Sequence, residues 1–195
     1  MIDLSRIYIA LLHYPVYNKT GQVVASAITN LDLHDLARMT ATFGLGKYFV
    51  VSPLPLQRKL AGQLMGHWLS GPGADKNWTR KEAFRRVEVL EDLKPALEEI
   101  KAESGSAPKL VATTAREMKN QVGFGRLRKI IREQEKQSFL VLFGTGWGLT
   151  EEFMLSDCDY VLEPIRGGAD YNHLSVRTAA AIILDRLFAI DRKTD

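Results

Sequence analysis

Three short segments of the sequence carry residues that could surround a small ligand. They are residues 113–115 (Thr-Thr-Ala), 144–148 (Gly-Thr-Gly-Trp-Gly) and 163–168 (Glu-Pro-Ile-Arg-Gly-Gly), and each directly follows an apolar run. Glycine has no Cβ atom, so such a segment lets the backbone approach a flat ligand and present unhindered amides. In parallel α/β sheets, ligands bind at the carboxyl ends of the strands. We therefore expect the three segments to converge on one pocket.

The glycine-rich segment 144–148 does not match a phosphate-binding motif. The dinucleotide fingerprint needs three glycines after the first strand, whereas this segment follows the fourth apolar run and has a different spacing. No lysine follows it at the position that a P-loop requires. A plain tight turn remains an alternative for this segment.

The sequence carries no pattern typical of a metal site or a disulfide framework. Its four histidines are scattered without metal-ligand spacing: His13, His34, His67 and His173. The single cysteine, Cys158, excludes an internal disulfide and a cysteine-rich zinc site. Its neighbours Asp157 and Asp159 disfavour a thiolate. We expect no metal, and we expect Cys158 to be a buried or half-buried residue.

Basic residues gather in two segments. One holds Arg80, Lys81, Arg85 and Arg86, and the other holds Arg126, Arg128, Lys129 and Arg132. Either segment could contact phosphates, or form a solvated helix face. The chain has 26 Lys and Arg against 23 Asp and Glu, a net charge of +3, which permits a polyanionic partner without requiring one.

Five short apolar runs predict buried strands. They cover residues 7–12, 48–51, 110–112, 139–143 and 160–162. Helical patterns lie between them, and this alternation indicates an α/β fold with a mostly parallel sheet flanked by helices. A length of 195 residues suits one domain, residues 1–195, with a helical insertion around residues 66–105.

Capping residues predict where the first helices begin and end. Asp32, followed by Asp35, indicates a helix start, and Gly44 indicates its end. Pro55 suits a first helical position. The Gly-Pro-Gly sequence at residues 71–73 breaks the helix that Pro55 opens.

Two more capping signals follow. Thr79 and Glu82 predict a capping box. The helix behind it should carry Phe84, Val87 and Leu90, and should be interrupted at Pro95. Thr150 is expected to cap a short helix. The last helix, around residues 179–187, is apolar over more than one face, which favours a dimer interface.

No segment of the sequence is suited to a membrane. The apolar run at residues 7–12 is too short for a signal-peptide core and ends at His13, Tyr14 and Pro15. No stretch approaches the ~20 apolar residues that a membrane span needs. We expect no membrane association and a cytoplasmic location.

Three segments together resemble one family. The first runs from Asn30 to Arg38 and continues through Phe43-Gly44 to Pro53. The second is residues 139–149, and the third is residues 162–168 followed by Asn-His-Leu-Ser-Val at 172–176. Their order and separation are similar to the three motifs of the SPOUT class of S-adenosylmethionine-dependent RNA methyltransferases. Within the TrmH/TrmD superfamily, the likeness is closest to a less characterised bacterial branch.

The resemblance implies a fold, a cofactor and partners. The expected fold has a C-terminal segment threaded into a trefoil knot, and the expected cofactor is S-adenosyl-L-methionine in a bent shape. The expected partners are a second copy in a homodimer and an RNA, either tRNA or rRNA. The methylated atom would be a ribose 2′-hydroxyl or a base atom.

The resemblance also assigns residues. Arg38 and Asn30 would act on the acceptor, with an Arg38–Asp35 ion pair as the alternative for Arg38. The donor would be bound by Thr113, Thr114, Gly144, Thr145, Gly146, Trp147, Gly148, Ile165, Gly167, Asn172 and Leu174. The sequence departs from TrmH-type relatives at Gly146, where many carry an acidic residue. Either Asn172 or His173 could match the family asparagine.

Two other functions stay open at this point. One is a non-catalytic RNA-binding protein on the same fold, and the other is a nucleotide-binding small-molecule enzyme that uses the segment 144–148. Three converging segments rather than one favour the methyltransferase.

Overall fold

The computed structural model describes residues 2–189 and places six strands of that range in one parallel sheet. The strand order is β5-β4-β1-β7-β6-β8. The strands are β1 (Ile7–Leu12), β4 (Tyr48–Val51), β5 (Val87–Leu90), β6 (Lys109–Ala112), β7 (Phe139–Gly144) and β8 (Tyr160–Val161). Every pairing between them is parallel. The mostly parallel α/β sheet predicted from the sequence is confirmed.

The apolar runs form strands because both faces of the sheet are covered. All six side chains of β1 are buried. Its odd-numbered residues enter one apolar cluster and its even-numbered residues enter the other. A strand buried on two faces needs apolar residues at every position, which explains the unbroken runs.

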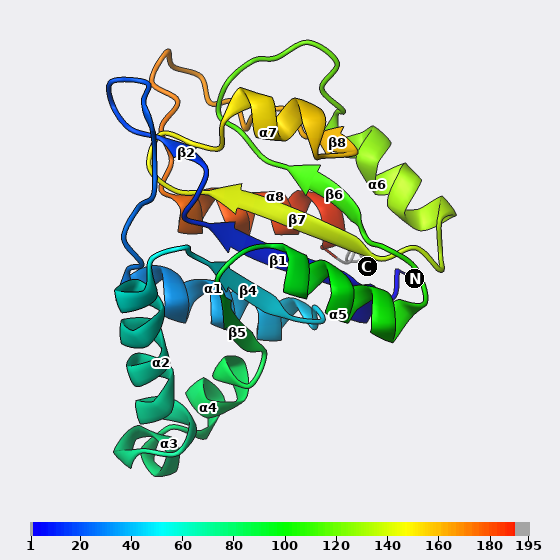
Figure 1. The fold of residues 1–195 in the computed structure, drawn as a ribbon. Coiled ribbons are helices and arrows are strands. Elements are labelled where there is room, and N and C mark those ends of the chain that lie inside the picture. The colour runs from blue at the N-terminus through cyan, green and yellow to red at the C-terminus, as the bar shows by residue number, and fades with distance from the viewer. Residues whose placement is uncertain (1, 190–195) are drawn as a thin grey trace.

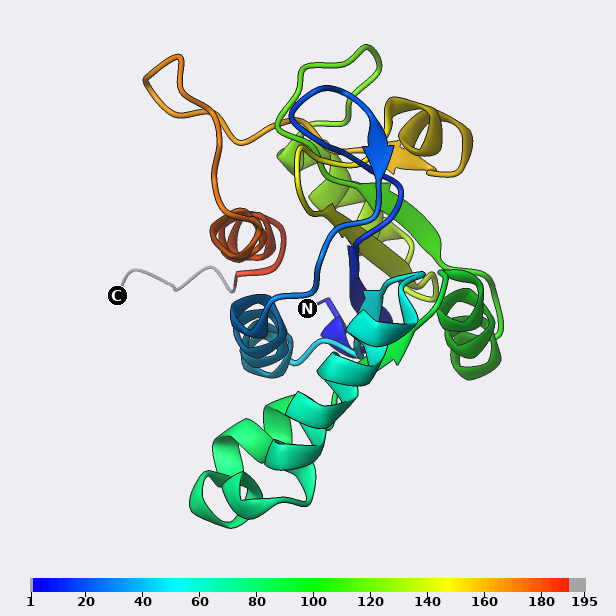
Figure 2. The ribbon, with the colours of Figure 1, turned by 60° about the vertical axis from the view of Figure 1, so that its left-hand side comes forward.

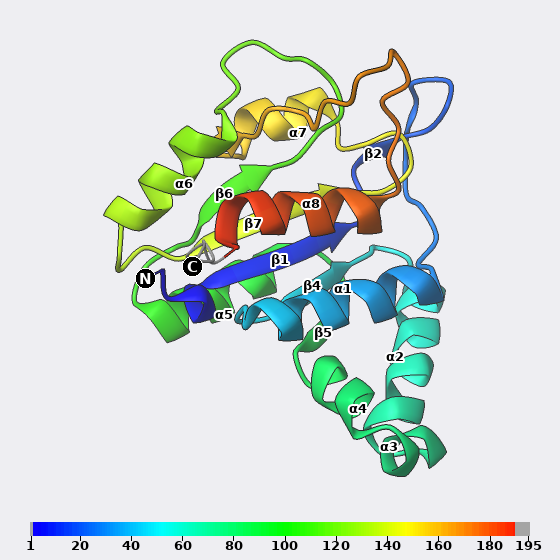
Figure 3. The same cartoon turned by 180° about the vertical axis from the view of Figure 1, so that it is seen from behind.

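Helices form a layer on each side of the sheet. The helices α1 (Asn30–Phe43), α6 (Phe124–Glu133) and α8 (Val176–Phe188) contribute to one cluster, and Figure 3 shows them on one face. The helices α5 (Lys94–Ser104) and α7 (Glu151–Ser156) contribute to the other, and they lie in front of the sheet in Figure 1. The carboxyl ends of the strands all point to the same edge.

A lobe stands away from the sheet beside α1. It contains α2 (Pro55–Leu69), α3 (Pro72–Lys76) and α4 (Trp78–Phe84), and Figures 1 and 2 show it extending below the sheet. We define the lobe as residues 55–86.

None of the helices within residues 2–189 combines the length and the apolar character that a membrane crossing requires.

A small hairpin packs over the carboxyl end of β1. Its strands are β2 (Val16–Tyr17) and β3 (Val23–Val24), and a short 3₁₀ helix (Leu4–Arg6) precedes β1. The turn between β2 and β3 is organised by the Asn18 side chain, whose Oδ1 accepts from the Thr20 and Gln22 amides. Val16 also bridges to Leu149, which ties the hairpin to the chain after β7.

Several predicted helix ends are confirmed. Pro55 is the first residue of α2, Gly44 is the C-cap of α1, and Thr150 caps α7 by accepting from the Phe153 amide. The predicted start of α1 at Asp32 is wrong. The N-cap is Thr29, which accepts from the Asp32 amide, so Asp32 lies inside the first turn.

The helix predicted from Thr79 through Leu90 is also wrong. Asn77, not Thr79, caps α4, and this helix ends at Phe84. Residues 87–90 form the edge strand β5, and Pro95 lies in the first turn of α5. An apolar residue at every third position suits a helix, but Val87 and Val89 also alternate as in a strand, where β-branched residues are favoured. The predicted insertion around residues 66–105 therefore includes a strand of the main sheet.

Candidate active site

A cavity of about 550 Å³ lies where β1, β6 and β7 reach their carboxyl ends. Four stretches of chain supply its wall: residues 26–32, 113–116, 143–148 and 165–183. The stretches after β6, β7 and β8 thus meet, as the rule for parallel sheets predicts. Apolar side chains of Phe143, Leu174 and Ile183 form part of the wall.

Most of the predicted donor-binding residues line this cavity. They are Thr113, Thr114, Gly144, Thr145, Gly146, Trp147, Gly148, Ile165, Asn172 and Leu174. Gly167 does not border the cavity. Asn172 and His173 both do, so the structure places both candidates for the family asparagine at the same wall. The Asn172 side chain donates to the Ala115 carbonyl at 3.2 Å, which joins the chain after β8 to the chain after β6.

The glycine-rich segment is held rigidly by the hairpin. Gly146 and Gly148 have φ values of +58° and +92°, which residues with a Cβ atom rarely adopt. Between them, the Trp147 amide donates to the Tyr17 carbonyl at 2.9 Å, and the Tyr17 amide donates back to Gly148 at the same distance. The Trp147 ring is 56% exposed and lies edge-on to His173, with 5.5 Å between ring centroids.

Several amides of this segment already have acceptors in the protein. The Thr145 amide donates to Leu12, and the Gly148 amide donates to Thr145. With the Trp147 amide bonded to Tyr17, these three amides maintain the loop rather than face a ligand. The segment therefore offers shape and side chains to a ligand more than free amides.

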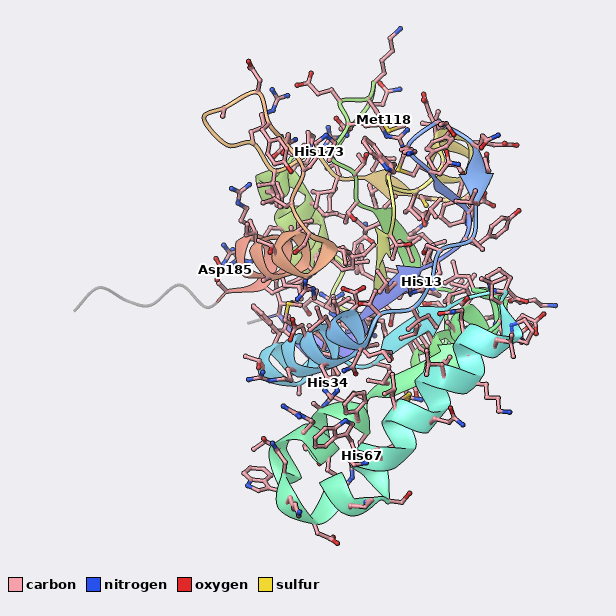
Figure 4. The ribbon with its side chains drawn as sticks, turned by 90° about the vertical axis from the view of Figure 1, so that its left-hand side faces the viewer. His13, His34, His67, Met118, His173 and Asp185 are labelled. Carbon is pink, nitrogen blue, oxygen red and sulfur yellow. The ribbon has the colours of Figure 1, made fainter. Side chains whose placement is uncertain are left out.

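A hydrogen-bond chain runs from a buried histidine to the cavity wall. The Thr145 hydroxyl donates to the Leu12 carbonyl at 3.3 Å and lies 2.5 Å from the Ser26 hydroxyl. Ser26 therefore donates to Thr145 and accepts from His13 Nδ1 at 2.9 Å. His13 lies at the end of β1 (Figure 4) and is fully buried. Burial lowers its pKa to about 4, which keeps the ring neutral near pH 7.

Asp32 places a buried carboxylate at the cavity wall. Its side chain is almost fully buried and lines the cavity. Thr29 donates to one carboxylate oxygen at 2.6 Å, and Arg177 Nε lies 3.3 Å from the other. Arg177 also donates to Asp35 at 3.0 Å. A carboxylate here can stabilise a positively charged ligand group.

Arg116 is a further charged residue at the wall, and it was not among the residues predicted from the sequence. Its guanidinium donates to the Leu149 carbonyl and lies over the Tyr17 ring, 5.0 Å from the centroid. Arg116 therefore fastens the chain after β6 to the hairpin and to the chain after β7. In the sequence, only its position directly after Thr113-Thr114-Ala115 indicates that Arg116 could reach the cavity.

The two predicted acceptor residues lie outside the cavity. Asn30 is the exposed first residue of α1, next to Thr29 at the wall. Arg38 is exposed, six residues beyond Asp32, which corresponds to ~9 Å along the helix and ~240° around it. No Arg38–Asp35 ion pair forms within residues 2–189, because Arg177 takes Asp35 instead.

Two further kinds of reactive group are a metal-ligand cluster and the cysteine thiol. Within residues 2–189, no three His, Cys, Asp or Glu side chains are grouped so that they could hold a metal ion. Cys158 is half-buried, and burial together with Asp157 and Asp159 raises its pKa to about 12. Cys158 is therefore an unreactive thiol, as predicted.

Comparison with protein families gives a match over almost the whole chain. The sequence pattern of a family described as SAM-dependent RNA methyltransferase matches residues 6–189. The matched range includes all four stretches of the cavity wall.

Curated relatives show substantial identity. A tRNA (guanine-N(1)-)-methyltransferase of Oleidesulfovibrio alaskensis is 45% identical over 181 residues, which is 93% of this chain and 41% of that protein. An uncharacterized protein of Aquifex aeolicus is 42% identical over 188 residues, which is 96% of this chain and 91% of that protein. The chain thus spans about two fifths of the first relative and most of the second.

Solved structures with the same fold are more distant in sequence. A probable methyltransferase of Bordetella pertussis has a TM-score of 0.61 at 19% identity, covering 94% of this chain and 95% of that one. The SpoU methyltransferase AviRb of Streptomyces viridochromogenes, crystallised with AdoMet, has a TM-score of 0.57 at 13% identity, covering 93% and 58%. At such identities the likeness establishes the fold alone.

Proposed function

Because this chain belongs to the family of SAM-dependent RNA methyltransferases, we propose that it binds S-adenosylmethionine in the described cavity and transfers its methyl group to RNA. The observation that carries the proposal is the convergence of three post-strand segments on one cavity with a buried carboxylate. The alternative, a nucleotide-binding small-molecule enzyme, uses only the segment 144–148. It would not explain why the segments after β6 and β8 also line the cavity.

The residues of the cavity fit this donor. A volume of about 550 Å³ lies within the usual range of small-molecule sites. Apolar walls suit the adenine, and the Thr114 hydroxyl, which accepts from the Arg116 amide, can donate its proton to a polar group of the nucleoside. The Asp32 carboxylate complements the positive charges of the sulfonium and the ammonium. The bound donor supplies a methyl group already activated by the positive sulfur.

The chain's own contribution is to hold the reactants in position. The hairpin and the segment 144–148 fix one wall, so the donor site needs little reorganisation. The rim carries an aromatic set of Trp147, His173 and Tyr171, with 5.5 Å between successive ring centroids. Exposed aromatic rings of this kind stack against unpaired bases. The acceptor nucleotide would be placed against this rim.

Arg38 stays our candidate for activating the acceptor. A guanidinium beside a hydroxyl favours its deprotonated form. Because Arg38 does not border the cavity of its own chain, this role requires a homodimer in which α1 of a second copy faces the rim. Arg38→Ala should abolish methyl transfer while S-adenosylhomocysteine binding, measured by calorimetry, stays unchanged. Full turnover by this variant would remove Arg38 from the reaction.

The RNA class is proposed with the names of the curated relatives in view. Two curated relatives carry the name tRNA (guanine-N(1)-)-methyltransferase, but the chain matches only 41% of each. The matched part need not be the one that performs the named reaction. We propose tRNA as the first substrate to test, with rRNA next, and a cytoplasmic location because those RNAs are there.

The trefoil knot belongs to the same proposal. The chain leaves β8 at the edge of the sheet and returns to α8. This helix packs against α1, α6 and β7, and β7 is an inner strand of the sheet. On the way it passes the chain after β6, to which Asn172 is bonded. This return path supports a threaded C-terminal segment. We also propose a single domain in which the lobe is the inserted part.

One experiment tests the function directly. Total RNA from cells lacking this gene should contain a nucleotide that purified protein and labelled S-adenosylmethionine can methylate, and mass spectrometry of the digested RNA identifies it. Calorimetry with S-adenosylhomocysteine tests the donor site independently. No heat and no thermal shift at millimolar ligand would refute the donor site, and binding without any modified nucleotide would favour the non-catalytic alternative.

A further inference from the structure

The positive charge of the chain is concentrated in the lobe. Residues 55–86 hold seven Lys and Arg against two Asp and Glu, a net charge of +5. The whole chain carries only +3, so the other 163 residues hold 19 basic and 21 acidic side chains, a net charge of −2. A protein whose surplus lies on one protruding element presents that element to a polyanion.

Part of this charge is available for a partner. Arg58 and Arg85 pair with Glu91 and Glu82. Within residues 2–189, no ion pair is formed by the lysines of the lobe, which are Lys59, Lys76 and Lys81. Each could neutralise a phosphate without breaking an internal contact.

The lobe is a packed unit rather than a loose loop. Trp68 at its centre contacts His34 of α1 and His67, with ring centroids 5.4 and 4.8 Å away. Figure 4 shows His34 on the side of α1 that faces the lobe. Arg80 stacks over Trp68 at 4.2 Å, and a Cβ atom on Gly73 would lie 2.6 Å from this ring. The lobe can therefore hold a partner in a fixed position.

A second tryptophan has no such packing role. Trp78, the first residue of α4, is 75% exposed. A large exposed aromatic side chain beside unpaired lysines is the combination that binds single-stranded nucleic acid, because every base offers a face for stacking.

The lobe is connected to the cavity wall. Gln57, in the first turn of α2, accepts the Ile28 amide at 2.8 Å. Ile28 lies between Ala27 and Thr29, both of which line the cavity. The lobe is therefore attached to the cavity wall at residues 26–32, through the first turn of α2.

We propose that the lobe, residues 55–86, is the RNA-docking surface of this protein. Its lysines contact the phosphate backbone and Trp78 stacks on an unpaired base, while the nucleotide to be methylated enters the cavity. The inference rests on the proposed function in taking RNA as the substrate. The charge favours RNA over a second copy of the chain as the partner of the lobe, because two lobes of net charge +5 repel each other.

The test compares two variants of equal charge. K59A/K76A/K81A removes three positive charges from the lobe, and R126A/K129A/K136A removes three from α6 and the turn after it, on the opposite side of the molecule (Figure 1). RNA affinity is measured by titration at several salt concentrations. The lobe variant should lose at least about tenfold, with a salt slope smaller by ~2, because three phosphate contacts each release ~0.7 counterion. The α6 variant should stay close to wild type.

Trp78 gives an independent check. Trp78→Ala should weaken RNA binding about tenfold, and Trp78→Phe should restore most of it, since stacking needs an aromatic face. Equal loss in both triple variants, or no loss in the lobe variant, would overturn the inference. A dimer that dissociates only in the lobe variant would assign the lobe to a second copy and overturn it too.

The two proposals can fail separately. S-adenosylhomocysteine binding is measured for every variant, and the lobe variants should retain it. If the wild-type protein and the lobe variants methylate RNA equally well at limiting RNA, the docking surface alone is refuted. If RNA binding depends on the lobe but S-adenosylhomocysteine does not bind, the methyltransferase function alone is refuted.

Discussion

At the scale of single residues, Asp32 and Asp35 share one guanidinium but have different surroundings. Arg177 bonds to both. Asp32 is buried and borders the cavity, whereas Asp35 is half-exposed and does not. Both carboxylates therefore join α1 to α8, and only Asp32 also faces the cavity.

Asp32→Asn should weaken S-adenosylmethionine binding about tenfold, and S-adenosylhomocysteine binding less, because the latter lacks the positive charge on sulfur. Asp35→Asn removes a carboxylate from the same ion pair and should leave both affinities unchanged. Calorimetry with the two ligands measures the difference. If Asp32→Asn weakens both ligands equally, the carboxylate does not recognise the sulfonium.

His13 makes stability depend on pH. The folded protein holds its pKa at about 4, whereas the unfolded chain has a value near 6.5. The unfolded state therefore binds a proton more readily, so the stabilisation is complete above pH 6.5 and is lost as the pH falls toward 4. The difference corresponds to about 3 kcal/mol at most.

Replacing His13 by Gln should flatten this dependence. We expect the variant to be less stable at pH 7, because a buried ring is lost, but to lose less stability than wild type between pH 6.5 and 4. Urea unfolding at a series of pH values measures both curves. Acidic groups titrate equally in the two proteins, so parallel curves would show that His13 contributes nothing to the slope.

At the scale of elements, the segment 144–148 is shaped by its backbone conformation. A Cβ atom on Gly148 would meet nothing within 4 Å, and the same is true of Gly62 in α2. The two glycines differ in backbone conformation, since only Gly148 has a positive φ. They therefore isolate the conformational contribution from any clash.

Gly148→Ala should destabilise the protein by ~1 kcal/mol or more, because the left-handed region is unfavourable for alanine. Gly62→Ala should stabilise it by ~0.5–1 kcal/mol, because alanine is the better helix former. Thermal unfolding of both variants gives the comparison. The two changes are expected to have opposite signs, so a neutral Gly148→Ala would mean that the segment relaxes easily.

The sequence predicted the strands and the cavity wall better than the helix starts. β1 and β4 were predicted to the residue, because strands covered on both faces must be apolar throughout. β5 was missed, since four residues at a sheet edge can fit a helical spacing equally well. The two-residue strands β2 and β3 carry no periodic signal.

The wall residues were predictable for a topological reason. Ten of the eleven predicted donor-binding residues line the cavity, because they follow strands of a parallel sheet and such strands end at one edge. Asp32 and Ser26 were missed because their roles depend on distant partners. A carboxylate in the first turn is sufficiently explained as a helix cap, and its burial depends on Arg177 near the other end of the chain.

At the scale of the whole molecule, α8 leaves one face without a partner in the described chain. Thr178, Ala181 and Asp185 are exposed along it, while Ile183 and Leu184 are buried against the sheet. A dimer through α8 would cover the exposed face and could bring Arg38 of a second copy to the rim.

Ala181→Arg should make the protein monomeric without unfolding it, because the new side chain points to solvent in a single chain. Glu98→Arg on α5, which lies on the other face of the sheet, should leave the oligomeric state unchanged. Light scattering at micromolar concentration measures both. A wild-type protein that is already monomeric under these conditions would reject the dimer.

The uneven charge of the molecule has a consequence for the speed of encounter. With +5 on the lobe and −2 on the rest, the protein is an electric dipole, and a nearby polyanion exerts a torque that turns the lobe toward it before any contact forms. Such orientation raises the fraction of productive collisions and weakens as salt shortens the range of the field. Stopped-flow measurements should therefore find that added salt slows association more than it hastens dissociation.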